Sequence, residues 1–386
     1  MSLINSLSTP YYGKQLESEK SSYSSVLGML DEILMSFSSL IADVEEGRVS
    51  DQMLRLEIEK KVNQMKGIYQ PDEVKRLLFD TIYGYGILQD FINDIDITDI
   101  DIPKYNFIMV KRNGKLEKIS KKFDSEIDFD RFCKLLAIRH GGILNEVDDH
   151  CRVSDKSNHL RINICIPPRN VHGASLNIRK HLVNALTFDE LISKNFMCLQ
   201  VRSLIEKINK SKSNILICGK GAAGKTTLLR SIIEVGDEME RMLICESDAE
   251  IYPQKNNVIV QNIKKREYGG RNITLSDLIR EGLTMSLDTY CIGEIVGSEA
   301  WDFVKAGYTD HRVLGTIHAS SAVDALDRIL MLSENVTRIT QDKLQNMIAR
   351  AINHVIYLKN FKVHEIVEVK GYNMGDESFE VEYLYG

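Results

Sequence analysis

The chain has 386 residues, of which 43% are hydrophobic and 27% charged, the mixture of an ordered globular protein rather than a disordered or fibrous one. With 49 Lys and Arg against 55 Asp and Glu the formal net charge is −6. This charge disfavours a dedicated duplex-binding surface, because neutralising phosphates requires clustered positive charge. The length allows about two or three domains.

The cysteines and the hydropathy pattern indicate a cytoplasmic protein. The seven cysteines form no C-x-x-C pair, so we expect reduced thiols rather than a disulfide framework or a structural zinc site. The first residues show no basic segment followed by an apolar core, so we expect no signal peptide, and the sequence contains no run of 18 apolar residues of the kind that spans a bilayer. Any work at a membrane is therefore expected to depend on a partner.

The N-terminal region, residues 1–75, is predicted to be a flexible arm followed by a helical bundle. Residues 1–20 are polar, and apolar residues from Val26 to Val44 are spaced alternately by four and three, the seam of an amphipathic helix. This helix fits either a bundle appendage or a docking or oligomerising segment. Further helices are expected near 51–67 and, after a proline, near 72–83.

Residues 76–182 are predicted to form an α+β domain. Gly84 and Gly86 break the helical pattern, and Asn113–Gly114 between alternating segments is a strong signal for a two-residue hairpin. The expected elements are strands within 91–102 and 107–119, a helix near 127–140, and strands within 160–168 and 174–180.

Residues 183–386 are predicted to form a larger α/β domain. Thr187 and Glu190 form a capping box that opens a helix, and short apolar strands then alternate with helices, a pattern typical of a mostly parallel sheet. The three final segments are expected to form an antiparallel extension. The strands lie within 214–219, 241–246, 258–263, 289–294 and 312–318, and the extension within 354–360, 365–373 and 378–386.

A phosphate-binding loop follows the first of these strands. The segment GKGAAGKTT fits G-x-x-x-x-G-K-[ST], the P-loop or Walker A pattern, with a strand directly before it and a helix directly after it. Glycines let backbone N–H groups converge on the β-phosphate, Lys225 brings a positive charge, and the Thr226 hydroxyl can ligate Mg²⁺. The predicted phosphate-binding residues are Gly219, Gly221, Ala222, Ala223, Gly224, Lys225, Thr226 and Thr227.

Acidic residues and a histidine stand at the ends of other strands of the same predicted sheet. Glu294 replaces the usual Walker B aspartate, and there it can polarise the attacking water or hold Mg²⁺ through water. Glu246, Asp248 and Glu250 alternate along a segment read as extended, so they can line one wall, or they can be solvated loop acids. The predicted catalytic residues are Glu246, Glu250, Glu294 and His318, the last as a γ-phosphate sensor.

These motifs resemble a known family. The P-loop, ICESDAEIY, CIGEIVGSEA and GTIHASSAVDALDR occur in the order found in the secretion and pilus ATPases, and the resemblance covers about residues 78–386. GYGILQDFINDIDITDI is similar to the entry into the N-terminal domain of the CpaF-like ATPases of tight-adherence (Tad/Flp) pili.

The resemblance implies a RecA-like core that assembles into a homo-hexameric ring, with ATP and Mg²⁺ as ligands. It implies that Arg161 and Arg179 reach the phosphates, where guanidinium groups neutralise charge on the transferred phosphoryl. Arg169 and Lys180 are weaker candidates. It also implies an inner-membrane platform protein as partner, with membrane contact only through that partner and no direct nucleic-acid binding.

The sequence departs from the family pattern at several charged positions. Val296 stands where an arginine is common, Ser247 where an aspartate is usual, and Thr284 and Leu287 where Arg and Pro are common. Three hypotheses follow, and the losses at Val296 and Ser247 motivate the second. The first is an ATP-hydrolysing hexameric motor for pilus assembly or protein secretion, the second a nucleotide-gated assembly or regulatory module with weak hydrolysis, and the third a nucleic-acid motor.

Overall fold

The computed structural model describes residues 49–64, 75, 80, 84–112, 114–123, 125–181, 184–263 and 271–386. The chain divides into two compact units, Met1–His181 and Leu182–Gly386, which are described separately. The helix predicted over 26–44 lies outside the described residues, as does most of that predicted over 72–83. The helix predicted near 51–67 is present as α3 (Asp51–Gln64).

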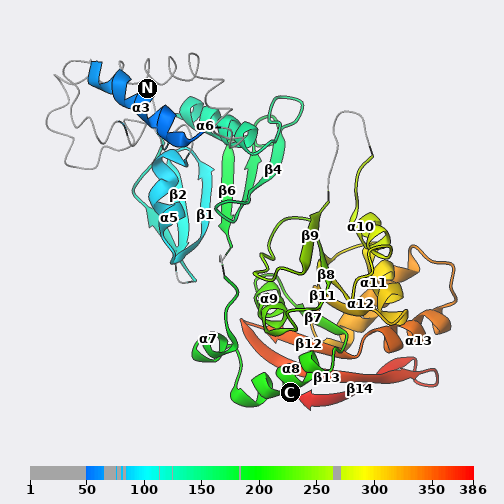
Figure 1. Ribbon diagram of the computed structural model, residues 1–386. Helices are drawn as coiled ribbons and strands as arrows, with labels where there is room; N and C mark the ends of the chain where they lie inside the picture. Colours follow the sequence, from blue (N-terminus) through cyan, green and yellow to red (C-terminus); the bar gives the residue numbers. More distant parts are fainter. Residues whose placement is uncertain are drawn as a thin grey trace. The chain divides into compact units, whose positions relative to one another are not determined.

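The first unit is built on a six-stranded antiparallel sheet in the order β3-β2-β1-β6-β5-β4 (Figure 1). The predicted two-residue hairpin is confirmed, because Arg112 pairs with Lys115 and Gly114 has φ +79°. The elements are η2 (Gly86–Leu88), α5 (Gln89–Asn93), β1 (Ile97–Lys104), β2 (Phe107–Arg112), β3 (Lys115–Ile119), α6 (Glu126–Arg139), β4 (His150–Asp155), β5 (Leu160–Cys165) and β6 (Ser175–Lys180).

One face of this sheet forms the core of the first unit. Alternate residues such as Ile100 and Ile162 are fully buried and share one hydrophobic cluster with Phe129 and Leu136 of α6. Ser125 begins α6 as its N-cap, and its hydroxyl accepts the Asp128 N–H. The strand predicted over 91–102 is shorter than expected, because its first residues belong to α5.

The second unit is an eight-stranded mixed sheet in the order β14-β13-β12-β7-β11-β10-β8-β9, with helices on both faces (Figure 1). Its strands are β7 (Ile215–Gly219), β8 (Met242–Glu246), β9 (Val258–Asn262), β10 (Thr289–Ile295), β11 (Arg312–Ile317), β12 (His354–Lys359), β13 (Lys362–Asn373) and β14 (Ser378–Tyr385). Its helices are α7 (Phe188–Ser193), α8 (Leu199–Lys210), α9 (Lys225–Val235), α10 (Leu275–Gly282), α11 (Glu299–Tyr308), α12 (Ala322–Glu334) and α13 (Gln341–Ala351).

Two hydrophobic clusters hold the helices on the sheet. Residues of α7, α8 and α9 pack on one face, and residues of α10 to α13 pack on the other. Burial of both faces explains why these strands read as continuous apolar runs. The capping box of Thr187 and Glu190 is confirmed at the start of α7. The predicted antiparallel extension is confirmed, because β12 pairs antiparallel with β13 and β13 with β14; β12 also runs parallel to β7 and so joins the extension to the parallel strands.

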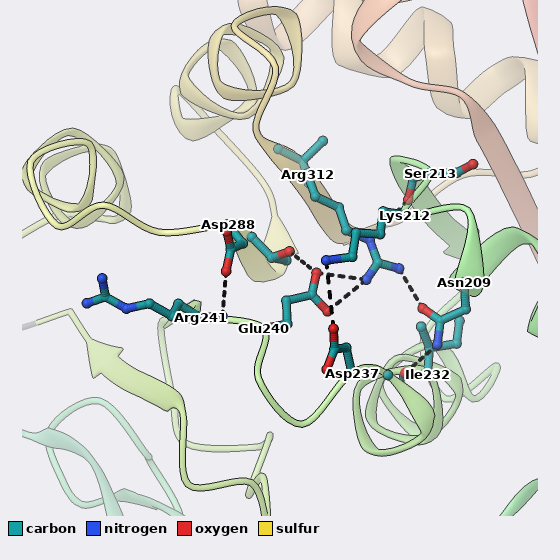
Figure 2. Close-up of polar contacts among 12 residues, drawn as sticks. Asn209, Lys212, Ser213, Ile232, Asp237, Glu240, Arg241, Asp288 and Arg312 are labelled. Carbon is teal, nitrogen blue, oxygen red and sulfur yellow. Dashed lines mark hydrogen bonds and ion pairs between the residues drawn. The ribbon is translucent and has the colours of Figure 1, made fainter.

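The amino-terminal edge of the parallel strands is closed by a buried ion pair (Figure 2). Arg312 Nη1 donates to both oxygens of the Glu240 carboxylate, at 3.0 and 3.1 Å. Both side chains are at most 5% exposed. Arg312 also donates to Asn209 Oδ1 at 2.5 Å, and the Thr289 hydroxyl donates to Glu240. Because every charge has partners, the cluster ties α8, β10 and β11 together without leaving an uncompensated charge.

The cysteines, predicted to be reduced thiols, lie mostly in the protein interior. All seven are free, and five of them are buried. Among the described residues no helix is long and apolar enough to cross a membrane.

Candidate nucleotide-binding site

The predicted phosphate-binding loop connects β7 to α9 in a conformation that requires small residues. Gly219, Ala222 and Gly224 have φ values of +151°, +59° and +97°. At Gly219 a Cβ atom would lie 2.4 Å from the carbonyl oxygen of Leu358, so no larger residue fits there. The loop therefore folds tightly at the N-terminus of α9, where backbone N–H groups and the helix dipole favour an anion.

Lys225 is the first residue of α9, and its ammonium group lies within the loop. The side chain is buried, and Nζ donates to the carbonyl oxygens of Gly219 at 3.1 Å and of Lys220 at 3.2 Å. Thr226 and Thr227 follow in the first turn and are half-buried. The structure thus places all eight predicted phosphate-binding residues in one loop and helix start.

Glu294 and His318 form a polar pair next to this loop. His318 Nε2 lies 2.8 Å from Glu294 Oε1, with side-chain exposures of 42% and 49%. The ring also faces the loop, since a Cβ atom on Gly221 would lie 3.7 Å from His318 Cε1. Glu294 stands where the pairing of β10 with β11 is interrupted, between Ile292 and Ile295. Such irregularities redirect side chains, and this one leaves the carboxylate accessible at the sheet edge.

Glu246 ends β8 and is 2% exposed, close to the strand that carries Glu294. Its Cγ would lie 3.0 Å from a Cβ atom on Gly293, so the glycine makes room for it. Burial raises the pKa of the Glu246 carboxyl to about 8. Two backbone N–H groups donate to Oε1 and lower this pKa, but the effect of burial is larger. Oε2 is buried and has no hydrogen-bond partner in the described part of the chain. A carboxyl with a pKa near neutrality is suited to proton transfer.

The acidic segment after β8 is not extended, which corrects the expectation that three acids alternate along one wall. The chain bends at Ser247 and Asp248, and the N–H groups of Glu250 and Ile251 return to Glu246 Oε1 at 3.1 and 2.9 Å. Glu246 therefore points inward, whereas Asp248 and Glu250 are half-buried. The alternation failed because the chain turns to bring two backbone N–H groups to one oxygen of the buried carboxyl.

The two predicted arginines belong to the first unit and lie side by side there. Arg161 of β5 is paired with Arg179 of β6, and Arg179 is paired with Asp99 of β1 on its other side. Two like charges directly opposite each other in a sheet are unfavourable unless an anion or another group compensates them. Lys180 is engaged by the backbone, since Nζ donates to the Phe91 carbonyl at 3.0 Å, and Arg169 pairs with Asp149 at 2.8 Å.

The loop after β10 is held by a residue that the sequence reasoning did not single out. The buried Glu299 accepts the N–H groups of Val296 and Gly297 at 2.6 and 2.8 Å. The sequence does carry a signal for this contact, because Glu299 is the first residue of a helix and stands three residues after Val296. Val296 itself is 54% exposed.

The side chains beside the loop offer oxygen donors, the ligand type that magnesium prefers. No group of three or more His, Cys, Asp or Glu side chains that could hold a metal occurs among the described residues. Thr226 and Glu294 supply only oxygen atoms, which suit Mg²⁺ held mainly by phosphates and water.

A P-loop on a parallel sheet, with a glutamate and a histidine at the neighbouring strand ends, defines an α/β protein with a RecA-like core. Residues 148–366 match the family described as "Type II/IV secretion system protein", which is more than half of the chain. The chain therefore belongs to this family.

Individual relatives agree with this assignment. A "Putative conjugal transfer protein" of Mycobacterium tuberculosis is 23% identical over 290 residues, covering 73% of this chain and 82% of the relative. The type IV secretion system protein VirB11 of Bartonella quintana is 25% identical over 211 residues, covering 53% of this chain and 58% of VirB11. The structure of the Legionella pneumophila ATPase DotB is 18% identical with a TM-score of 0.51, covers 83% of this chain and 82% of DotB, and supports the fold alone.

Proposed function

We propose that this chain is an ATP-hydrolysing motor of a secretion or pilus machine. The observation that carries the proposal is the convergence of Lys225, Glu294 and His318 at one edge of one sheet. Membership of the type II/IV secretion family supports the same activity. ATP is the proposed substrate, and water attacks its γ-phosphorus to give ADP and phosphate.

The residues of the loop bind and orient the triphosphate in this proposal. Lys225 exchanges its two carbonyl partners for β- and γ-phosphate oxygens, and the N-terminus of α9 faces the phosphates. Thr226 and Glu294 would hold Mg²⁺, directly and through water, and the ion would neutralise charge on the β- and γ-oxygens. His318 positions the Glu294 carboxylate through their 2.8 Å contact.

The carboxylates orient and polarise the attacking water in this proposal. Glu294 is exposed enough to accept a hydrogen bond from that water, which orients a lone pair toward phosphorus. Glu246 ends the adjoining strand β8 with its carboxyl buried, Glu250 follows it in the bend, and we assign Glu246 as the group whose protonation controls the rate near neutral pH. Arg161 and Arg179 are proposed to neutralise charge on the transferred phosphoryl group.

The assembly and its surroundings are part of the same proposal. We propose an α+β domain over residues 76–182 and the ATPase domain over 183–386, whereas most of the arm and helical bundle predicted over residues 1–75 lies outside the described residues. A homo-hexameric ring at the cytoplasmic face of the inner membrane, docked on a membrane platform protein, is the working state. The Tad/Flp-type pilus is the proposed machine, supported by the entry motif at Gly84–Ile100.

The test is phosphate release from Mg·ATP by the purified full chain over a range of protein concentrations. We expect turnover that rises with assembly and falls by about 100-fold or more in Glu294→Gln, with Glu334→Gln, an exposed carboxylate at the end of α12, as matched control. ATP binding with turnover equal to that of Glu294→Gln would favour the regulatory module. Stimulation by DNA with a steep salt dependence would favour the nucleic-acid motor.

A further inference from the structure

The turn between β12 and β13 lies at the same sheet edge as the phosphate-binding loop. β12 runs parallel to β7, and Leu358 is paired with Gly219, the first residue of the loop. The chain then reverses through Asn360 and Phe361, between the paired residues Lys359 and Lys362. A two-residue turn therefore stands beside the loop at the carboxyl ends of the parallel strands.

This turn carries an aromatic residue in a conformation that favours glycine. Asn360 and Phe361 have φ values of +51° and +58°, the geometry of the tight hairpin turn in which Asn-Gly is the preferred pair. A bulky residue in the left-handed region is strained, and such strain is often found at ligand-binding positions. The aromatic ring at this position is therefore the feature that needs an explanation.

The ring of Phe361 packs against the loop and a second aromatic ring. Its centroid lies 4.9 Å from that of Phe196, with the planes at 80°. A Cβ atom on Gly224 would lie 2.7 Å from Phe196 Cε2 and 3.0 Å from Phe361 Cδ2, so both rings touch the last residue before α9. The Val363 N–H donates to the Phe196 carbonyl at 2.9 Å and fixes the hairpin to the segment that carries Phe196.

The two rings differ in exposure. Phe196 is completely buried, whereas Phe361 is 37% exposed. Phe196 thus fills the interior behind Gly224, and Phe361 presents an open aromatic surface next to the first turn of α9. This surface adjoins the phosphate-binding loop and belongs to the same compact unit.

We propose that Phe361 contacts the base of the bound nucleotide by stacking. The inference rests on the proposed function, because it assumes that the loop binds a nucleoside triphosphate. Phosphates held by the loop and the first turn of α9 leave the nucleoside to extend past that turn, where the Phe361 ring stands. Stacking uses the face of any base, so Phe361 contributes affinity for purine nucleotides over inorganic polyphosphate and discriminates little between ATP and GTP.

The test compares binding of Mg·ATP, Mg·GTP and inorganic tripolyphosphate to the full chain by calorimetry. Phe361→Ala is expected to weaken ATP and GTP roughly tenfold, as base–aromatic stacking elsewhere does, and to leave tripolyphosphate within about twofold. Phe361→Tyr restores nucleotide affinity and Phe361→Leu does not. Tyr383→Ala, which removes an exposed aromatic ring from β14, changes none of the three affinities.

The outcomes separate this inference from the proposed function. Lys225→Ala weakens all three ligands if the loop binds phosphates, and no binding by the wild type would overturn the proposed function. Normal nucleotide binding by Phe361→Ala, or equal weakening of ATP and tripolyphosphate, would overturn only the stacking role.

A spectroscopic variant keeps the test decisive if Phe361→Ala folds poorly. The chain has one tryptophan, Trp301, so Phe361→Trp on a Trp301→Phe background carries a single reporter. We expect its fluorescence to change with ADP or ATP and not with tripolyphosphate. An equal response to both ligands, or no response to bound ADP, would contradict stacking.

Discussion

The two edges of the parallel sheet in the second unit are built by opposite rules. At the amino-terminal edge Arg312 and Glu240 are buried and fully partnered. At the carboxyl edge Glu294 and His318 are half-exposed, and Glu246 is buried with one oxygen lacking a partner in the described residues. The polar groups at the amino-terminal edge stabilise the fold, whereas those at the carboxyl edge are available to bind a ligand.

The largest effect on ATP turnover is expected from a substitution at the carboxyl edge, with little change in stability. Lys225→Ala removes the charge that faces the phosphates, so we expect ATP turnover to fall by at least about 100-fold. Its melting temperature should stay close to that of the wild type, because Nζ donates to the carbonyl oxygens of Gly219 and Lys220 within its own loop. Lys210→Ala at the end of α8 is the matched control. Normal ATP turnover by Lys225→Ala would contradict a functional role for the carboxyl edge.

The amino-terminal edge should show the reverse pattern. Arg312→Met leaves Glu240 buried without its cation, which costs about 3–5 kcal/mol of unfolding free energy. Urea denaturation measures this loss, and Arg241→Met, an exposed arginine at the same edge, should change stability by less than about 0.5 kcal/mol.

A double variant sharpens this prediction. Adding Glu240→Leu to Arg312→Met removes the unpaired charge and should recover part of the stability, although Asn209 and Thr289 then lose their partners. Turnover per folded molecule should be unchanged in both variants. A loss of turnover at full folding would show that the two edges are coupled.

Glu246 is expected to make stability depend on pH. Its pKa is about 8 in the folded chain and near the ordinary carboxyl value when unfolded, so between these values the native state holds a proton that the unfolded state releases. Its contribution to stability is therefore complete at low pH and is lost as pH rises toward 8. Relative to Glu246→Gln, the wild type should lose about 1 kcal/mol per pH unit between pH 5 and 8. Parallel slopes in denaturation at several pH values would refute the raised pKa.

The smallest effect is expected at Val296. Its side chain is exposed and its N–H is held by Glu299, so Val296→Arg should change stability by less than about 0.5 kcal/mol and leave turnover unchanged. A several-fold rise in turnover would instead show that the missing arginine limits hydrolysis, as the regulatory hypothesis requires.

Local patterns predicted the loop, most strands and the capping box of Thr187 and Glu190, because each depends on residues close in sequence. The loop from Gly219 to Thr227 needs only its own glycines and the strand and helix beside it. The bend after Glu246 was not predicted, because it follows from burial of a carboxylate that seeks backbone N–H groups.

The sequence pattern did not predict contacts between residues that are far apart in the chain. Arg312 and Glu240 are 72 residues apart, and Phe361 reaches Gly224 only because β12 pairs with β7. Their partners are determined by strand order, which single-sequence periodicity does not contain. The 2.8 Å contact of His318 with Glu294 likewise depends on the neighbouring positions of β10 and β11, although strand-end placement had already marked both residues.

The most direct test of the account is a single-turnover experiment with labelled ATP bound to an excess of the assembled full chain. We expect the wild type to convert bound ATP to ADP and release phosphate, whereas Glu294→Gln holds ATP unreacted and Lys225→Ala fails to hold it. ATP that remains intact on the wild type, at the same level as on Glu294→Gln, would contradict the proposal that this edge of the sheet hydrolyses ATP.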